Sequence, residues 1–377
     1  MKAAIYRKYG PPDVVTLAEV PMPAPKDNEV LIRIHATTVS TGDWRARSLT
    51  MPTGFGLLGR LVFGLLGPRK PILGTELAGE IVAIGKSLTR FKADDQVFAF
   101  PGAAYGCHAE YRTMPETGLI ALKPANLSWE EAAALSFGGT TALHFLKTKG
   151  NIQRGDKVLI VGASGCVGTA AVQLAKHFGA EVTGVSSTIN LDLLRKIGAD
   201  RVIDYTATDF TATGDTYDII LDATGAAPHA RVGHMLKPGG RLLVVQGSLA
   251  QALGIGGPSR SSGHKSIAGV AAMRPADLQF LADLATAGAF TPVIDRCYPL
   301  EYVAEAHAYV DTGRKRGSVV LTVGQALFVG RAAVDPSFAE TFQDGACVLV
   351  PEFDGIASLI YLALLPPVML GRAVDSI

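Results

Sequence analysis

The sequence predicts an α/β fold, in which a parallel sheet covered by helices is joined to a smaller unit rich in β-strands. In residues 157–168 an apolar, β-branched run leads through a glycine turn into the start of a helix. Short apolar strands then alternate with helical segments, which is typical of a parallel sheet with right-handed crossovers. Residues 1–122 instead hold short alternating segments between Pro and Gly turns, which favours a small, partly open barrel.

The glycine turn is the most specific feature of the sequence. Gly162, Gly165 and Gly168 stand at a spacing that seats the pyrophosphate of a dinucleotide. Gly165 leaves the backbone bare for phosphate oxygens, the helix start offers free N–H groups, and Gly168 allows close packing on the strand. Read as G-x-G-x-x-G, the pattern has Ala163 at its first glycine, so a strand-to-helix turn without a ligand is the alternative.

Apolar runs and glycine stops outline the rest of the parallel sheet. The helix after the turn has one apolar face and should end at Gly179, and a helix over 191–197 should end at Gly198. Residues 237–240, Lys-Pro-Gly-Gly, are expected to form a turn before the fifth strand. The further strands are expected at residues 181–185, 201–203, 217–221 and 241–245.

Composition bounds the class of protein. The chain has 377 residues, enough for two domains with sizeable cores. Its net charge is +1, and no basic block suggests a nucleic-acid partner or an anionic membrane. The four cysteines are far apart and form no C-x-x-C pair, which argues against a structural zinc site. The first residues do not form a secretory signal, so we expect a cytoplasmic protein.

Two apolar stretches are too short to cross a bilayer, so we expect no stable membrane insertion. Residues 54–67 contain Arg60 and several glycines, which fits a helical lid or wall beside a pocket, or ordinary packing between domains. Residues 355–370 lack charges and carry a Pro-Pro pair, which favours a packed or loosely associated tail over a membrane anchor.

The organisation along the chain follows from these segments. Ser128 and Glu131 have the spacing of a capping box at a helix start. After residue 290 the chain reads as extended, helical and extended again, so we expect it to return to the first unit. The expected organisation is a β-rich unit over 1–122, a nucleotide-binding unit over 123–290, a return segment over 291–324, and a C-terminal extension of unknown role over 325–377.

Eight short segments, modest one by one, become specific through their order and spacing. They are residues 9–14, 42–45, 73–80, 90–97, 131–134, 162–168, 198–205 and 292–300. Over residues 1–323 the chain resembles the medium-chain dehydrogenase/reductase superfamily, in its zinc-free, quinone-oxidoreductase-like (zeta-crystallin-like) branch. The resemblance implies a GroES-like catalytic domain interrupted by a Rossmann NADP-binding domain, with the active site in the cleft between them. Such relatives are commonly dimers, so a homodimer is a further expectation.

The resemblance implies no bound metal. Zinc-dependent relatives hold zinc with a Cys near position 43, a Gly-His-Glu segment and a later Cys. This chain has Asp43, then Gly-Thr-Glu at 74–76, and the single later cysteine Cys107. Tetrahedral zinc needs three or four placed ligands. His108 adjoins Cys107, but adjacent residues on a strand point to opposite faces.

NADPH is the expected cofactor. NAD-specific proteins of this fold carry an acidic residue near the end of the second strand, where it binds the ribose. No carboxylate stands in residues 185–190, and Ser186, Ser187 and Asn190 can donate hydrogen bonds to a 2′-phosphate. Relatives with a similar segment are usually NADPH-linked, although many carry Arg or a polar residue where this chain has Ile189. Simple capping of the loop by Ser186 and Ser187 is the alternative.

The remaining cofactor contacts are implied by position in the family fold. Ends of the fourth and fifth strands should face the crevice, and other residues match family positions beside the adenosine, the pyrophosphate or the nicotinamide. The expected contacts are Thr141, Ala163, Ser164, Gly165, Cys166, Val167, Tyr205, Thr224, Gln246 and Gly247.

The expected reaction is hydride transfer from NADPH to a quinone or to the C=C bond of an α,β-unsaturated carbonyl. Ser40, where relatives often carry Asn, is a candidate hydrogen-bond donor in catalysis, and Asp43 is a second candidate that also suits a loop anchor. The apolar segment 57–66 suggests an apolar carbonyl or quinone substrate rather than an acyl-CoA. A metal-free alcohol or aldehyde oxidoreductase and a non-catalytic NADPH-binding interaction protein are the alternatives.

Overall fold

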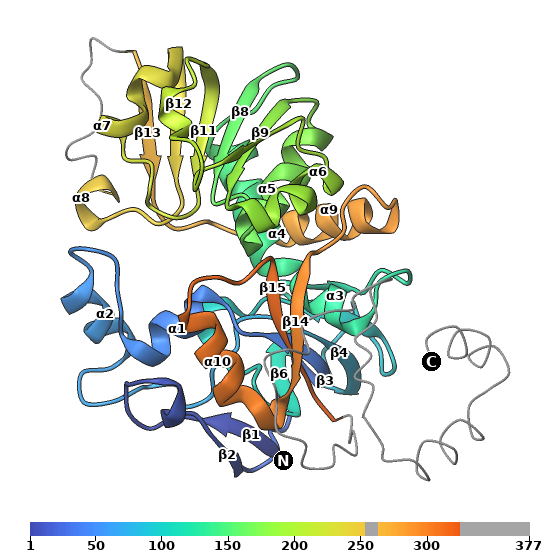
Figure 1. Cartoon of the computed structure of the whole chain (residues 1–377). Helices are drawn as coiled ribbons and strands as arrows, with labels where there is room; N and C mark the ends of the chain where they lie inside the picture. Colours follow the sequence, from blue (N-terminus) through green and yellow to red (C-terminus); the bar gives the residue numbers. More distant parts are fainter. Residues whose placement is uncertain (253–262, 325–377) are drawn as a thin grey trace, which may run out of the picture. The chain divides into compact units, whose positions relative to one another are not determined.

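Two large sheets organise the computed structural model, which describes residues 1–252 and 263–324 (Figure 1). One has six strands in the order β10-β9-β8-β11-β12-β13. The other has seven strands along the path β14-β15-β3-β4-β5-β7, with β6 paired to β3, and β1 and β2 form a separate ribbon. An α/β fold with a parallel sheet and a β-rich part is therefore confirmed.

The six-stranded sheet is parallel throughout, and its strand order is that of a doubly wound dinucleotide-binding sheet. Its strands are β8 Lys157–Val161, β9 Glu181–Ser186, β10 Arg201–Asp204, β11 Tyr217–Asp222, β12 Leu236–Val244 and β13 Lys265–Ala268. The expectation of a turn at residues 237–240 is corrected. These residues belong to β12, where the register against β11 shifts from Tyr217↔Leu236 to Ile219↔Arg241, so they form an irregular strand segment.

Helices cover both faces of this sheet because its strands are apolar on both sides. In β8, Val158 and Ile160 belong to the core under α4, α5, α6 and α9, whereas Leu159 and Val161 belong to the core on the other face. The helices are α3 Trp129–Ala134, α4 Ser136–Leu143, η3 His144–Lys149, α5 Cys166–His177, η4 Thr188–Asn190, α6 Leu191–Lys196, η5 Phe210–Ala212, α7 His229–Val232, η6 Gly233–Met235, α8 Leu249–Ala252 and α9 Pro275–Thr286.

The β-rich part is built from both ends of the described chain. Its strands are β1 Lys2–Ile5, β2 Thr16–Glu19, β3 Glu29–Thr38, β4 Leu77–Ile84, β5 Gln96–Ala99, β6 Tyr111–Pro115, β7 Ile120–Leu122, β14 Ile294–Pro299 and β15 Ser318–Thr322. Its helices are η1 Pro12–Val14, α1 Thr41–Ser48, α2 Gly56–Phe63, η2 Gly102–Ala104, η8 Leu300–Tyr302 and α10 Val303–Asp311. Strand β15 pairs antiparallel with β3, for example Val320 with Thr38, so the returning chain completes the sheet.

Local signals in the sequence were accurate where the interaction is local. The predicted capping box is present, since Glu131 N donates to Ser128 Oγ at 3.1 Å and Ser128 N to Glu131 Oε2 at 2.8 Å. Gly179 ends α5 with a φ of +80°, as a C′ glycine does. Among the helices of residues 1–252 and 263–324, none has the length and apolar character needed to cross a membrane. The expectations for residues 325–377, including the apolar stretch 355–370, lie outside the described residues.

Candidate functional site

The glycine turn joins β8 to α5 with very little space between backbones. A Cβ added to Gly168 would lie 2.2 Å from Gly162 O, and one added to Gly162 would lie 2.3 Å from Thr224 Cγ2. Gly162 also has a φ of +77°, which side chains rarely adopt. Close packing therefore requires Gly162 and Gly168, and the prediction made for Gly168 is confirmed.

Gly165 differs from its two neighbours, because the fold alone does not require it. Its φ of −75° and ψ of 172° suit any residue, and an added Cβ would meet only Gly162 O, at 3.6 Å. Gly165 is the N-cap of α5 and provides no side-chain cap, so no N-cap side chain occupies the first N–H groups of the helix. An open space in front of free helix donors is suited to an anion such as a pyrophosphate.

The residues beside Gly165 serve this turn through their backbone. Ala163 is fully buried, and the Sγ of Cys166 lies 3.3 Å from Ser318 Oγ of β15, away from the open face. Ser164 O accepts the Gly317 N–H at 2.8 Å, which ties the turn to the chain entering β15. The side chain of Cys166 is thus part of the packing, whereas its N–H begins the helix.

Ser186 and Asn190, expected to donate to a 2′-phosphate, are turned inward. Ser186 Oγ donates to Ser164 Oγ at 2.8 Å. Ser186 and Asn190 are both buried. Asn190 Nδ2 lies 3.1–3.2 Å from the hydroxyls of Ser164, Ser186 and Ser187. The cluster holds the end of β9 against the glycine turn, because buried polar groups must find partners. Ser187, which is half-buried, and the exposed Thr188 and Ile189, the latter 78% exposed, lie at the surface.

An aspartate that the sequence reasoning missed shapes the next strand end. Asp222, 1% exposed, accepts hydrogen bonds from Thr224 N and Oγ1 at 3.0 Å, and from Gly225 N and Ala227 N at 2.8 Å. These bonds fold the chain back after β11 and set Thr224 beside Gly162. An Asp at the end of an apolar strand, three residues before Gly225, was the available signal for such a turn.

The other predicted contacts lie at the same edge of the sheet, because they follow the ends of parallel strands. Tyr205 follows β10, is 58% exposed, and donates its N–H to Ser186 O. Gly247 follows β12, and a Cβ there would lie 2.8 Å from Ala268 Cβ. Thr141 lies on α4, which packs on the start of α5, and is 6% exposed.

Arg45 is a second residue that sequence reasoning missed. It lies on α1, and its Nη2 donates to Gln246 Oε1 at 2.8 Å, while Gln246 Nε2 donates to Ala223 O. Burial lowers the pKa of the guanidinium, and its Nε has no partner. Among the described residues no carboxylate forms an ion pair with Arg45. A partly desolvated, unneutralised cation therefore stands beside the strand end at Gln246.

Ser40 and Asp43, named above as catalytic candidates, are engaged in holding α1. Ser40 Oγ donates to Asp43 Oδ2 at 2.6 Å and accepts from Asp43 N, which makes a capping box at the helix start. Asp43 Oδ1 accepts the Gly74 N–H at 2.7 Å, so Asp43 anchors the loop before β4. Both side chains are buried, and the geometry gives each a structural partner in place of a free donor.

Glu76 links the two sheets. Its carboxylate accepts the Thr38 hydroxyl at 2.5 Å and the Phe137 N–H at 2.6 Å, which ties strands β3 and β4 to α4. The side chain is 1% exposed, and burial raises its pKa from 4.5 to about 7. Because α4 carries Thr141, this carboxyl positions one wall of the candidate site.

Comparison with known proteins identifies the family to which this chain belongs. The family described as alcohol dehydrogenase GroES-like domain matches residues 26–124, and that described as zinc-binding dehydrogenase matches residues 197–321. A 2-methylene-furan-3-one reductase of Solanum lycopersicum is 34% identical over 333 residues, covering 85% of this chain and 79% of the relative. The chain belongs to the medium-chain dehydrogenase/reductase superfamily. Its similarities lie in the quinone-oxidoreductase-like branch.

Two further members of the superfamily are similar over most of their length. A chloroplastic NADPH-dependent alkenal/one oxidoreductase of Arabidopsis thaliana is 30% identical, covering 85% of this chain and 79% of that protein. The solved quinone oxidoreductase from Coxiella burnetii has a TM-score of 0.75 and 26% identity, covering 86% of this chain and 99% of that chain. The superfamily assignment agrees with a nicotinamide dinucleotide as the ligand of the open turn.

The zinc that part of the superfamily binds does not fit these residues. At the corresponding positions Asp43 is fully hydrogen-bonded within its loop, Glu76 is held by Thr38 and Phe137, and burial raises the pKa of Cys107 to about 12. Within residues 1–252 and 263–324, no three His, Cys, Asp or Glu side chains are grouped to hold a metal ion.

A pair of glycine variants separates ligand binding from packing. Gly165→Ala should keep its free energy of unfolding within about 1 kcal/mol of the parent, because the added methyl has room. The same methyl would occupy space needed by the dinucleotide, and we expect affinity to fall about tenfold or more by calorimetry. Gly168→Ala should instead cost at least about 3 kcal/mol in urea unfolding, because the methyl meets backbone. Full dinucleotide affinity in Gly165→Ala would contradict the assignment.

The raised pKa of Glu76 makes stability depend on pH. Between 4.5 and about 7 the folded state binds more protons than the unfolded state, so stability should fall as pH rises and level off above about 7. Glu76→Gln mimics the protonated carboxyl. The variant should therefore keep the free energy of unfolding, about 3 kcal/mol, that the wild type loses as pH rises through this range. Urea unfolding across this pH range measures it, with Glu305→Gln on the exposed start of α10 as the control. Parallel pH profiles for wild type and Glu76→Gln would refute this role.

Proposed function

We propose that this protein is an NADPH-dependent reductase of quinones or of the C=C bond of α,β-unsaturated carbonyls. The observation that carries the proposal is the contact of Arg45 with Gln246, which brings an unneutralised cation to the strand end expected to hold the nicotinamide. The relatives support the class of acceptor, since two of them are named for reduction of a methylene-furanone and of alkenals or alkenones.

The cofactor is held, in this proposal, along the carboxyl edge of the parallel sheet. The backbone around Gly165 and the free N–H groups of α5 bind the pyrophosphate. Ser187 and Tyr205 border the adenosine half, and Thr224, Gln246 and Gly247 border the nicotinamide half with Thr141. Bound NADPH supplies a hydride. No carboxylate stands in 185–190 to repel a 2′-phosphate, which favours NADPH over NADH.

Arg45 provides the electrostatic part of the reaction. Reduction of an enone or quinone places negative charge on the acceptor oxygen. A guanidinium that is partly desolvated and unpaired stabilises such charge more than it would in water. Gln246 orients Arg45 by accepting from Nη2, while the buried Nε has no hydrogen-bond partner among the described residues. This role needs no metal, which agrees with the residues at the zinc positions.

The domain boundaries belong to the same proposal. Strands from Glu29 to Leu122 and from Ile294 to Thr322 share one sheet, and strands from Lys157 to Ala268 share the other. This pairing supports a catalytic domain over 1–122 and 291–324 around a cofactor domain over 123–290.

The test is NADPH consumption with a panel of quinones, alkenals, ketones and simple aldehydes. Turnover with quinones or enones supports the proposal. Turnover with aldehydes alone would favour a metal-free alcohol or aldehyde oxidoreductase, and tight NADPH binding without turnover would favour a non-catalytic binding protein.

Arg45→Met should lower kcat about 100-fold or more, because removing one charge-stabilising donor costs about 2.7–4 kcal/mol in comparable sites. NADPH affinity should change little, and Arg45→Lys should restore part of kcat. An equal loss in NADPH affinity and in kcat would show that Arg45 acts on the cofactor instead of the acceptor.

Ile189 lies beside the proposed 2′-phosphate position and is 78% exposed, so a longer cation can be placed there without repacking. Ile189→Arg should raise the preference for NADPH over NADH about tenfold, in line with a charge-assisted hydrogen bond. The ratio of kcat/KM for the two cofactors measures it, and Ile189→Gln is the uncharged control. An unchanged ratio would place the 2′-phosphate elsewhere.

A further inference from the structure

Helix α2 and the chain that follows it present apolar side chains to solvent. The helix packs inward through Gly59, which lies against Met51, and through Phe63, whose ring lies 6.3 Å from that of Tyr105. The opposite side is apolar as well. This apolar crest consists of Leu57 (71% exposed), Leu58 (44%), Leu61 (46%), Val62 (63%), Leu65 (55%) and Leu66 (105%).

Such a surface needs an explanation, because a surface helix normally turns polar side chains to water. Contiguous exposed apolar patches mark binding surfaces for proteins, ligands or membranes. The segment 54–67 was expected to be a lid or wall, or to pack between domains. Each side chain of the crest keeps 44% or more of its surface exposed beside the residues that the structure describes.

The charged residues of the segment that carries the crest are all of one sign. Between residues 48 and 75 the charged side chains are Arg60, Arg69 and Lys70, and no acidic residue occurs. The exposed Arg7 and Lys8 adjoin them, since a Cβ on Gly67 would lie 3.3 Å from Arg7 O. These five cations form the basic rim. Within residues 1–252 and 263–324 none of them makes an ion pair.

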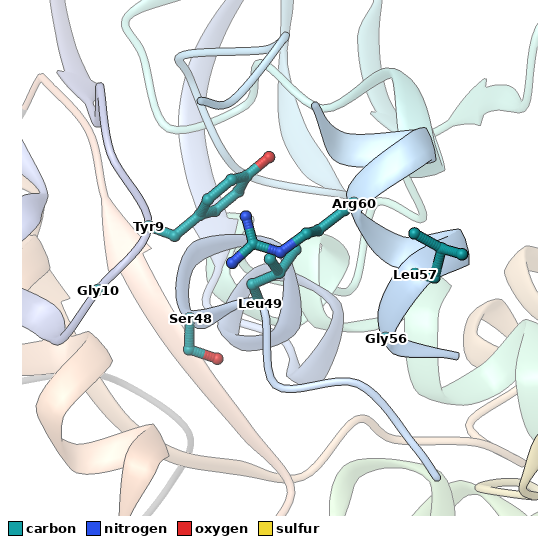
Figure 2. Close-up of a pocket in the computed structure, with 7 residues that line it drawn as sticks. All are labelled: Tyr9, Gly10, Ser48, Leu49, Gly56, Leu57 and Arg60. Carbon is teal, nitrogen blue, oxygen red and sulfur yellow. The ribbon is translucent and has the colours of Figure 1, made fainter. Parts of the chain in front are cut away.

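The crest and the rim are held in place by the fold. Tyr9 Oη donates to Gly64 O at 2.8 Å, which fixes the end of α2 against the N-terminal segment. Figure 2 shows the Arg60 side chain extending toward Tyr9 across a hollow of about 520 Å³, which Gly56 and Leu57 of α2 also line. Burial raises the pKa of Tyr9, and Arg60 and Arg69 lie close enough to oppose part of that rise. The cations and the leucines therefore lie next to each other on α2 and on the segments beside it.

We propose that α2 docks this protein on the surface of an anionic lipid bilayer. Leucines on one flank enter the boundary between head groups and acyl chains, and the basic rim contacts the lipid phosphates. The eight residues of α2 are far too few to cross the bilayer, so the attachment is peripheral. Charge decides against a second copy of the chain, because a symmetric contact over the crest would bring two basic rims together.

The experiment uses the full-length chain and sedimentation with vesicles. Mixed phosphatidylcholine–phosphatidylglycerol vesicles should carry the protein down, and pure phosphatidylcholine vesicles should carry about tenfold less. Leu58→Ser with Leu61→Ser, and separately Arg69→Glu with Lys70→Glu, should each lower the bound fraction about tenfold. Added salt should weaken binding of the wild type. The control is Val270→Ser, which removes an apolar side chain that is 91% exposed outside the crest.

Three results would overturn the proposal. They are absence of sedimentation with anionic vesicles, equal binding by the wild type and both double variants, and a fall in molar mass on substitution of the crest leucines. The last result, from light scattering after size exclusion, would assign the crest to contact between copies. Urea unfolding of each variant shows that it is folded, and Val270→Ser should bind vesicles as the wild type does.

Discussion

The contact on which the rest of the site depends is the approach of α5 to the end of β8. With Gly168 against Gly162 O, the helix begins at the strand end, and its first N–H groups open at the edge of the sheet. The same tight turn sets Ser164 where it meets Ser186 and Asn190 on one side and Gly317 on the other. One backbone approach therefore positions the proposed phosphate site and links it to the β-rich part.

Almost every polar side chain described around the candidate site has a hydrogen-bond partner within the protein. Asp222 folds the chain after β11, Asp43 anchors the start of α1, and Glu76 ties β4 to α4. Each is a buried carboxyl that accepts backbone or hydroxyl hydrogen bonds, which is how such groups lower the cost of burial. Arg45 is different, because it is partly buried without a carboxylate. In the function proposed above, Arg45 is the cation that acts on the bound acceptor.

The sequence predicted the parts of the fold that depend on short-range patterns. Strand β8, helix α5 and the capping box at Ser128 were visible because periodicity, glycine and capping act within a few residues. It was less informative about side-chain direction. Ser186 and Asn190 were recognised as hydrogen-bond donors, but their inward direction depends on Ser164, which is distant in sequence. Residues 237–240 had the composition of a turn, yet they lie within β12, between Leu236 and Arg241, which pair with β11 on either side of a register shift.

By itself the sequence determined the superfamily, the parallel sheet and the position of the glycine turn, because these follow from local geometry and the order of motifs. Only the tertiary structure decided which of the polar residues are engaged and which remain available. Ser40 and Arg45 belong to the same short segment. Ser40 caps its own helix, whereas Arg45 reaches Gln246 about 200 positions along the chain. Hydrogen-bond partners, burial and exposed apolar faces arise from contacts between distant segments, and no spacing within one segment encodes them.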